Sequence, residues 1–282
     1  MVTRLQFGPM TFSIDDDSTL GSELRAFIPS RDEHRRPDIA IRIEAARGRS
    51  TGPHDDCVVV RTGERVALEG PDFGAILVFP PPSSAPPELL PIEVEAWLAS
   101  TAARAGFPLT SLIGNLLALV GPSRGLLAVH AAGVLCVGCG GVQLVAAPTG
   151  AGKSTWAHAA GASAFCYNAA LVEPATGLAW PLPWTGDRDD AVVPRDATEI
   201  CVIGVVVSGG DAGRAPKALR VDETHALLRH AACLEPARDA FRVTALVAEL
   251  ARRVPTLALS ASVPIVESAK SLNCGATSVR AR

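Results

Sequence analysis

The segment from Leu144 to Thr155, LVAAPTGAGKST, constrains the fold of this chain more than any other stretch of the sequence. An apolar run leads directly into a turn with two glycines, and a lysine, a serine and a threonine follow at once. The apolar run predicts a buried strand, and a short helix is expected from Ser154 until Gly161 ends it. Because strands and helices alternate through the C-terminal two thirds of the chain, the fold class is predicted to be α/β.

The same turn has the residue types that hold a nucleoside triphosphate. Gly150 and Gly152 let backbone N–H groups turn inward around phosphate oxygens, where side chains would block the approach. Lys153 is expected to reach the β and γ phosphates, and Ser154 to place its hydroxyl on Mg²⁺. A nucleoside triphosphate with Mg²⁺ is therefore the predicted ligand of this loop. The predicted nucleotide contacts are Pro148, Thr149, Gly150, Ala151, Gly152, Lys153, Ser154 and Thr155.

One position departs from the G-x-x-x-x-G-K-[ST] pattern of such loops, since Ala147 stands where the first glycine is expected. The GAGKST part of the pattern is retained. The competing interpretation is a glycine-rich turn with an incidental lysine. It explains less, because strand, loop, lysine and hydroxyl residue occur in the order that phosphate binding requires.

From about Leu126 onward the chain resembles the HPr kinase family and its bacterial relatives, some of which phosphorylate serine on ribosomally made peptides such as lasso peptide precursors. Members combine a short strand with a histidine, a strand leading into a glycine loop, a brief helix, and a strand ending in two aspartates. The matching segments are AVHAAGV with His130, LVAAPTGAGKST and FCYNAALVE. In the tail, VDETHALL, an Arg-rich helix and VPTLAL also resemble small relatives of the family.

The resemblance implies an ATP-dependent kinase that phosphorylates a serine hydroxyl of a peptide or small protein, with an α/β phosphate-loop core of the HPr kinase/PEP carboxykinase-like type. In this family a carboxylate beside the γ phosphate accepts the hydroxyl proton. The positions of the two aspartates here read Asn168 and Ala169. Asn168 can join Ser154 as a Mg²⁺ ligand, but an amide cannot serve as a general base near neutral pH.

Three explanations of Asn168 stay open. In the first, the aspartate was lost naturally and the chain is a nucleotide-binding pseudokinase that acts as a nucleotide-gated binding module. In the second, Asn168 is an isosteric Asp-to-Asn change that traps a substrate complex. In the third, another acidic residue has taken the role of the aspartate. Asp187, Asp189 and Asp190 are the nearest acidic cluster in sequence, although such clusters more often form solvated loop surface. Phosphoryl transfer depends chiefly on positioning and charge neutralisation, so loss of the base need not abolish it.

His130 has two interpretations. By resemblance it lies near the phosphates and orients them or the base, whereas a lone histidine beside an apolar strand is also typical of a core residue. We favour the site, because His130 immediately precedes the strand pair that bears the loop and because histidine titrates where proton transfer is useful. His158 is interpreted as an ordinary helix residue. The candidate catalytic residues are Asn168, His130, Asp187 and Asp190.

The first third of the chain is predicted to be rich in strands. Alternating or apolar runs predict strands over residues 38–43, 57–60, 65–68 and 75–79. PPPSSAPP at Pro80–Pro87 predicts an extended linker. The expected domains are therefore a β-rich substrate-recognition region at 1–87 and the α/β domain at 88–282. Helices are predicted over 92–103 and 108–120.

Charge and hydropathy exclude several partners. The net charge of −3, without any run of Lys or Arg, excludes a nucleic-acid or anionic-lipid patch. Gly, Pro or charge interrupts every apolar stretch before the roughly 18 residues that a membrane span needs. Because acids lie within the first 17 residues and no apolar h-region follows, a cytoplasmic location is expected. The expected partner is the serine-bearing substrate, and a homo-oligomer is left open.

The seven cysteines, at 57, 136, 139, 166, 201, 233 and 274, are scattered and odd in number. This pattern predicts reduced thiols rather than a disulfide framework. Cys136 and Cys139 have metal-ligand spacing, but the neighbouring sequence has no second pair to complete four zinc ligands. No zinc site is therefore expected.

Overall fold

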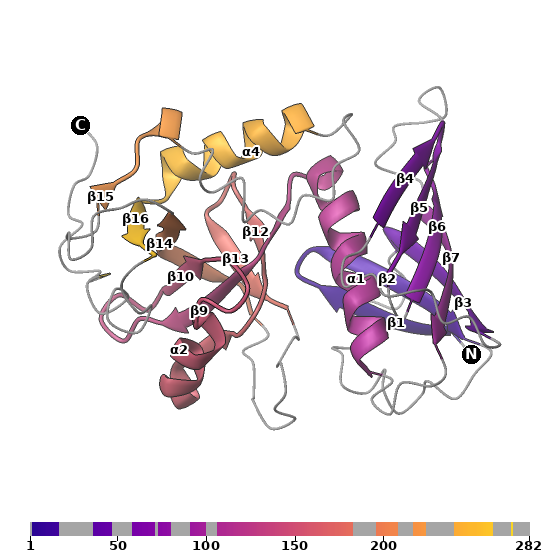
Figure 1. The fold of residues 1–282 in the computed structure, drawn as a ribbon, viewed down its shortest axis with the longest axis horizontal. Coiled ribbons are helices and arrows are strands. Elements are labelled where there is room, and N and C mark those ends of the chain that lie inside the picture. Colours follow the sequence, from indigo (N-terminus) through magenta and orange to yellow (C-terminus); the bar gives the residue numbers. More distant parts are fainter. Residues whose placement is uncertain are drawn as a thin grey trace. The chain divides into compact units, whose positions relative to one another are not determined.

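The structure, a computed structural model, describes residues 2–16, 36–46, 58–70, 73–79, 91–99, 106–182, 196–207, 217–223, 240–261 and 272. The chain divides into two compact units, which we call the N-terminal unit (Met1–Leu116 with Leu234–Ala237) and the C-terminal unit (Leu117–Cys233 with Arg238–Arg282). Each unit contains one mixed β-sheet, so the fold is mixed α/β (Figure 1). Within the described ranges, no helix is both long enough and apolar enough to cross a membrane.

A seven-stranded sheet in the order β1-β2-β3-β7-β6-β5-β4 forms most of the N-terminal unit. β3 pairs in parallel with both β2 and β7, and the other neighbours are antiparallel. The predicted strands at 38–43, 57–60, 65–68 and 75–79 are confirmed with small shifts of their ends. The strands are β1 (Val2–Phe7), β2 (Met10–Asp16), β3 (Ile39–Ala46), β4 (Val58–Thr62), β5 (Arg65–Glu69), β6 (Phe73–Val78) and β7 (Ile92–Ala99).

The helix predicted over residues 92–103 is wrong, because this segment forms the central strand β7. Its apolar side chains at 92, 94, 96 and 98 are buried, while Glu93 and Glu95 are exposed. This is the period of two that a strand requires. β7 therefore belongs to the N-terminal sheet, and the chain divides after Leu116 rather than at the predicted boundary of 87. The predicted linker, Pro80–Pro87, lies outside the described residues.

Helix α1 (Gly106–Val120) confirms the helix predicted over 108–120. Leu109, Leu112, Ile113 and Leu116 are fully buried or nearly so. Their spacing of three and four residues places them on one helical face. A 3-10 turn, Gly121–Arg124, follows α1.

The second sheet lies in the C-terminal unit and has the order β11-β9-β10-β14-β13-β12-β8, with β16 also pairing β14 and β15 pairing β16. β10 lies between β9, which is antiparallel to it, and β14, which is parallel to it. The strands are β8 (Leu127–Val129), β9 (Ala131–Leu135), β10 (Val142–Ala146), β11 (Ala164–Cys166), β12 (Ala170–Glu173), β13 (Leu178–Pro181), β14 (Thr198–Val207), β15 (Lys217–Ala218) and β16 (Thr256–Ser260).

Helices cover both faces of this sheet, as Figure 1 shows for α4 (Ala240–Arg253) and α2 (Lys153–Ala159). α4 packs Val243, Leu246, Val247 and Leu250 into one apolar cluster, which also contains Leu144 of β10. α2 packs Trp156 and Ala157 into the other cluster, with Val145. Since successive residues of a strand point to opposite faces, β10 contributes to both layers.

Two segments that the resemblance implies to be single strands, AVHAAGV and FCYNAALVE, are each divided in two. The chain leaves the strand at His130, between β8 and β9, and at Tyr167–Ala169, between β11 and β12. β9 pairs with β11 and β8 pairs with β12, so both interruptions occur where the chain passes from one strand pair to the next. His130 and Asn168 are therefore placed at matching breaks in neighbouring strands.

Candidate functional site

A loop of residues 147–152, which we call the glycine loop, connects β10 to α2. Gly150 and Gly152 have φ angles of +79° and +88°, a region that L side chains rarely adopt. A Cβ atom built at either glycine meets no other atom within 4 Å. The backbone conformation, not a lack of room, is therefore what requires glycine, and the space beside both residues is open.

Ala147, the departure from the expected pattern, is completely buried in the apolar cluster under α2. Its methyl group therefore packs into the core of the C-terminal unit. Ala151 N–H donates to Pro148 O at 3.3 Å across the loop. An alanine at the first position of the pattern is compatible with the loop because its side chain has a place in the core.

Lys153 crosses the loop that precedes it. Its Nζ donates to Ala147 O at 2.8 Å and to Pro148 O at 2.9 Å, and the residue is only 4% exposed. Burial lowers the pKa of Lys153 from 10.5 to about 8. The ammonium group of Lys153 thus lies against the backbone of the glycine loop, and this group loses its proton near pH 8.

Ser154 of α2, Asn168 and His130 come from three separate segments that meet around Tyr167 and Asn168. Ser154 Oγ donates to Tyr167 O at 3.2 Å, and Tyr167 immediately precedes Asn168. His130 Nε2 donates to Asn168 Oδ1 at 2.9 Å, since an amide oxygen can only accept. The candidate catalytic residues His130 and Asn168 are therefore in direct contact.

Strands β9, β10 and β11 pack closely at Gly133, near the break at His130. Gly133 of β9 lies opposite Leu144 in β10 and opposite Cys166 in β11. A Cβ at Gly133 would approach Leu144 Cδ2 to 2.9 Å and Phe165 Cδ1 to 3.0 Å. The absence of a side chain there lets the three strands pair closely.

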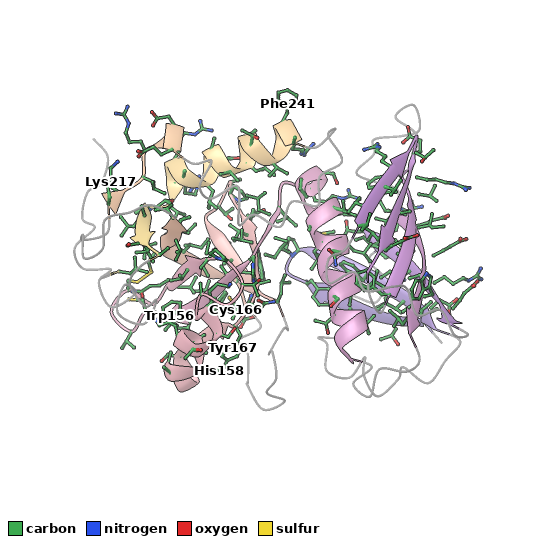
Figure 2. The ribbon with its side chains drawn as sticks, viewed as in Figure 1. Trp156, His158, Cys166, Tyr167, Lys217 and Phe241 are labelled. Carbon is green, nitrogen blue, oxygen red and sulfur yellow. A yellow bond between two sulfur atoms is a disulfide. The ribbon has the colours of Figure 1, made fainter. Side chains whose placement is uncertain are left out.

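His158, which the sequence predicts to be an ordinary helix residue, lies on the same helix as Ser154 and contacts Tyr167. Its ring stacks on Tyr167 with the ring centroids 4.3 Å apart and an interplanar angle of 25° (Figure 2). Ser154 and His158 are four residues apart on α2, so they share the helical face that contacts Tyr167. That spacing was the available sequence signal, but the position of Tyr167 was not predictable from it.

The remaining predicted residues have mixed placement. Thr149, Ser154, Thr155 and Asn168 are exposed, as expected of groups that meet a ligand. The aspartates proposed as alternative acids, Asp187, Asp189 and Asp190, lie outside the described residues.

The cysteines differ from the prediction of reduced thiols. Cys139 and Cys201 form a disulfide across 62 residues of sequence, and Cys136 lies beside them. Cys166 is buried, donates its thiol to Ala131 O at 3.5 Å, and has its pKa raised by burial. Sequence reasoning missed the third member of this cluster, because Cys201 lies 62 residues beyond Cys139 in the sequence.

No protein-family model matches the sequence, and no curated protein matches it at a significant level.

Proposed function

We propose that this chain is an ATP-dependent kinase that transfers phosphate to a serine hydroxyl of a peptide or small protein, on a phosphate-loop core of the HPr kinase/PEP carboxykinase-like type. The observation that carries the proposal is Lys153, a buried cation held against two carbonyls of the glycine loop. A buried charge is costly unless it is paired, so a lysine kept here fits a loop that receives an anion.

The glycine loop fits the triphosphate in two respects. The open space beside Gly150 and Gly152 leaves the backbone accessible, and their positive φ angles fit the inward-turned N–H groups that bind phosphate oxygens. Lys153 would exchange its two carbonyl partners for phosphate oxygens, which are stronger acceptors for a cation. The nucleotide site therefore depends mainly on residues 147–153.

Ser154 and Asn168 are the residues that would hold Mg²⁺. Their hydroxyl and amide oxygens are hard ligands of the kind that Mg²⁺ prefers, and both side chains are exposed beside Tyr167. When bound, Mg²⁺ supplies positive charge that neutralises the phosphate oxygens during transfer. We assign His130 the role of positioning Asn168, because the Nε2–H of His130 donates to the amide oxygen of Asn168.

A second candidate function is a nucleotide-gated binding module without turnover. The observation that favours it is the Asn168 amide, which accepts a hydrogen bond from His130 where the resemblance implies an aspartate. An amide cannot take up the proton of a serine hydroxyl. In both candidate functions ATP binds at the glycine loop, and the N-terminal β-rich region is assigned substrate or partner recognition.

Nucleotide binding is tested first, by calorimetric titration of MgATP into the wild type and Lys153→Ala. Loss of a charge-assisted contact, worth roughly 1.5–3 kcal/mol, should weaken ATP about tenfold to a hundredfold. The matched control is Lys217→Ala, because Lys217 is an exposed lysine of β15, which β16 and β14 separate from β10, and it pairs with Glu223. Equal affinity in all three folded proteins would exclude the glycine loop as the site.

Turnover then separates the two candidate functions. The wild type is incubated with labelled ATP and with serine-bearing peptides encoded beside its gene. Label on a serine that Lys153→Ala does not transfer supports the kinase. ATP binding without transfer to any peptide supports the binding module.

A further inference from the structure

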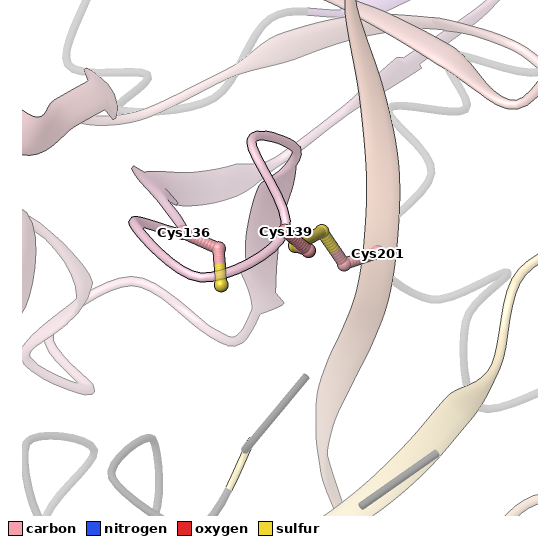
Figure 3. A group of neighbouring side chains, drawn as sticks. All are labelled: Cys136, Cys139 and Cys201. Carbon is pink, nitrogen blue, oxygen red and sulfur yellow. A yellow bond between two sulfur atoms is a disulfide. The ribbon is translucent and has the colours of Figure 1, made fainter. Parts of the chain in front are cut away.

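Three cysteine sulfur atoms meet at the end of β10 opposite the glycine loop. Cys136 and Cys139 come from the turn between β9 and β10, and Cys201 comes from β14 (Figure 3). The three Sγ atoms all lie within 4.8 Å of one another. Cys139 is exposed and the other two are half-buried, so an ion from solvent can reach the cluster.

The turn that carries the first two cysteines is closed by its own backbone. Cys136 N–H donates to Gly141 O at 2.8 Å, and Gly140 N–H donates to Cys136 O at 2.9 Å. Gly140 has a φ of +72°, which allows the chain to reverse directly after Cys139. The C-x-x-C spacing is the one that places two thiolates on one tetrahedral metal ion.

Cys201 is directed to this turn by an irregularity in strand pairing. Val142 lies opposite Ile200, but Gln143 lies opposite Val202, so Cys201 is the extra residue of a bulge. Bulges change the direction of a side chain and are frequent beside functional sites. A Cβ at Gly141 would collide with Cys201 Sγ and lie 2.6 Å from Glu199 O. Glycine at 141 thus allows the thiol of β14 to reach the turn.

The spacing of the three cysteines suits a bound ion. The Sγ atoms of Cys136, Cys139 and Cys201 all lie within 4.8 Å of one another. Around Zn²⁺, with Zn–S bonds of about 2.3 Å, tetrahedral ligands place sulfur atoms about 3.8 Å apart. A disulfide uses two of the sulfur atoms, whereas a metal ion is bound by all three.

We propose that the reduced chain binds one Zn²⁺ ion through the thiolates of Cys136, Cys139 and Cys201, a site separate from the nucleotide loop. Soft thiolate ligands select zinc over hard cations such as Mg²⁺. Each thiol releases its proton on binding, so three protons leave for each ion bound. The ion ties the β9–β10 turn to β14, and a ligand outside this set of cysteines takes the fourth position.

The oxidised and metal-bound forms are mutually exclusive. A phosphine reductant converts the Cys139–Cys201 disulfide to two thiols, and with water the phosphine becomes its oxide. The two electrons of this step come from phosphorus, and the two protons come from water. Zinc then binds the resulting thiolates without a further change of oxidation state.

The test measures zinc by mass spectrometry in the full-length chain after reduction, incubation with ZnCl₂ and gel filtration. The wild type and a Cys57→Ser control should each retain about one zinc per chain, because Cys57 is not one of the three clustered cysteines. Cys201→Ser and Cys136→Ser should each bind zinc at least about tenfold more weakly, since each lacks one of three thiolates. Absorption of the Co²⁺-substituted wild type should show sulfur-to-metal charge transfer.

Cys136→Ser keeps the test decisive if Cys201→Ser fails to fold, because it leaves both cysteines of the disulfide in place. A Cys136→Ser protein that forms the disulfide but loses zinc binding supports the proposal. Zinc binding equal to wild type in Cys136→Ser, or no stoichiometric zinc in the reduced wild type, overturns it.

Discussion

The two ends of strand β10 carry different chemistry and are assembled in different ways. At its carboxyl end, the glycine loop and Lys153 come from consecutive residues. At its amino end, the cysteine cluster combines a turn at 136–139 with Cys201, 62 residues beyond Cys139. A strand of five residues separates the two ends by roughly 13 Å, so the groups do not touch.

The difference shows which sites are visible in a sequence. The glycine loop depends on backbone conformation and on neighbours along the chain, so its residue types appear together. The cysteine cluster depends on the pairing of β10 with β14, so the sequence shows the C-x-x-C pair but not the third cysteine. The following experiments separate the chemistry of the two ends.

The largest expected effect is at the carboxyl end, in Asn168→Asp. A carboxylate there can accept the serine proton, and general-base assistance typically raises a rate about 10²–10⁴-fold. ATP affinity should change far less, because residues 147–153 supply most of the proposed contacts. Transfer of label to a serine peptide is the measurement, with Asn115→Asp on α1 as the matched control.

The transfer rate of Asn168→Asp also shows which carboxylate accepts the serine proton. If Asp187, Asp189 or Asp190 has the role, Asn168→Asp should change the rate little, and the corresponding Asp→Asn variant should abolish transfer. If every variant binds ATP and none phosphorylates a peptide, the binding module replaces the kinase.

The next effect is the pH dependence of ATP affinity. Because burial lowers the pKa of Lys153 to about 8, the amine is charged below that pH and neutral above it. The affinity for a phosphate anion should therefore fall as pH rises through 8, by about tenfold between pH 7 and pH 9. Titration calorimetry at constant ionic strength measures it. Lys153→Arg keeps its charge and should lose this dependence, so identical profiles would assign the titration to another group.

A smaller effect is expected from Gly152→Ala. An alanine forced to a φ of +88° costs about 1–2 kcal/mol, and relaxation of the loop should weaken ATP about fivefold to tenfold. Gly161→Ala is the matched control, because Gly161 has a φ of +58°, open space around it, and a position beyond the other end of α2. Both variants should unfold at lower denaturant, but only Gly152→Ala should lose ATP affinity. An equal loss in both would indicate a general effect on α2.

The smallest expected effect is the energetic coupling between the two ends of β10. Cys201→Ser should change ATP affinity by less than about twofold, because residues more than about 7–10 Å apart usually act additively. A double-mutant cycle with Lys153→Ala, read by titration calorimetry with zinc present, measures the coupling. A coupling of 1 kcal/mol or more would show that the cysteine end influences the nucleotide end.

Much of the fold was predictable from local patterns. The strands of the first third, the helix at 108–120 and the strand before the glycine loop are confirmed within a few residues. The helix predicted over 92–103 is wrong because a short apolar run can satisfy helical spacing and a period of two together. The segment forms a strand because it pairs with β3 on one side and β6 on the other, and β3 is distant from it in sequence.

The sequence by itself determined the residue types and order of the glycine loop, because positive φ at Gly150 and Gly152 and the step from strand to helix are local properties. Only the tertiary structure decided that His130 contacts Asn168 and that Cys201 joins the C-x-x-C turn. Both contacts depend on strand register. Since side chains alternate between the faces of a sheet, a shift of one residue between β10 and β14 would turn Cys201 to the opposite face.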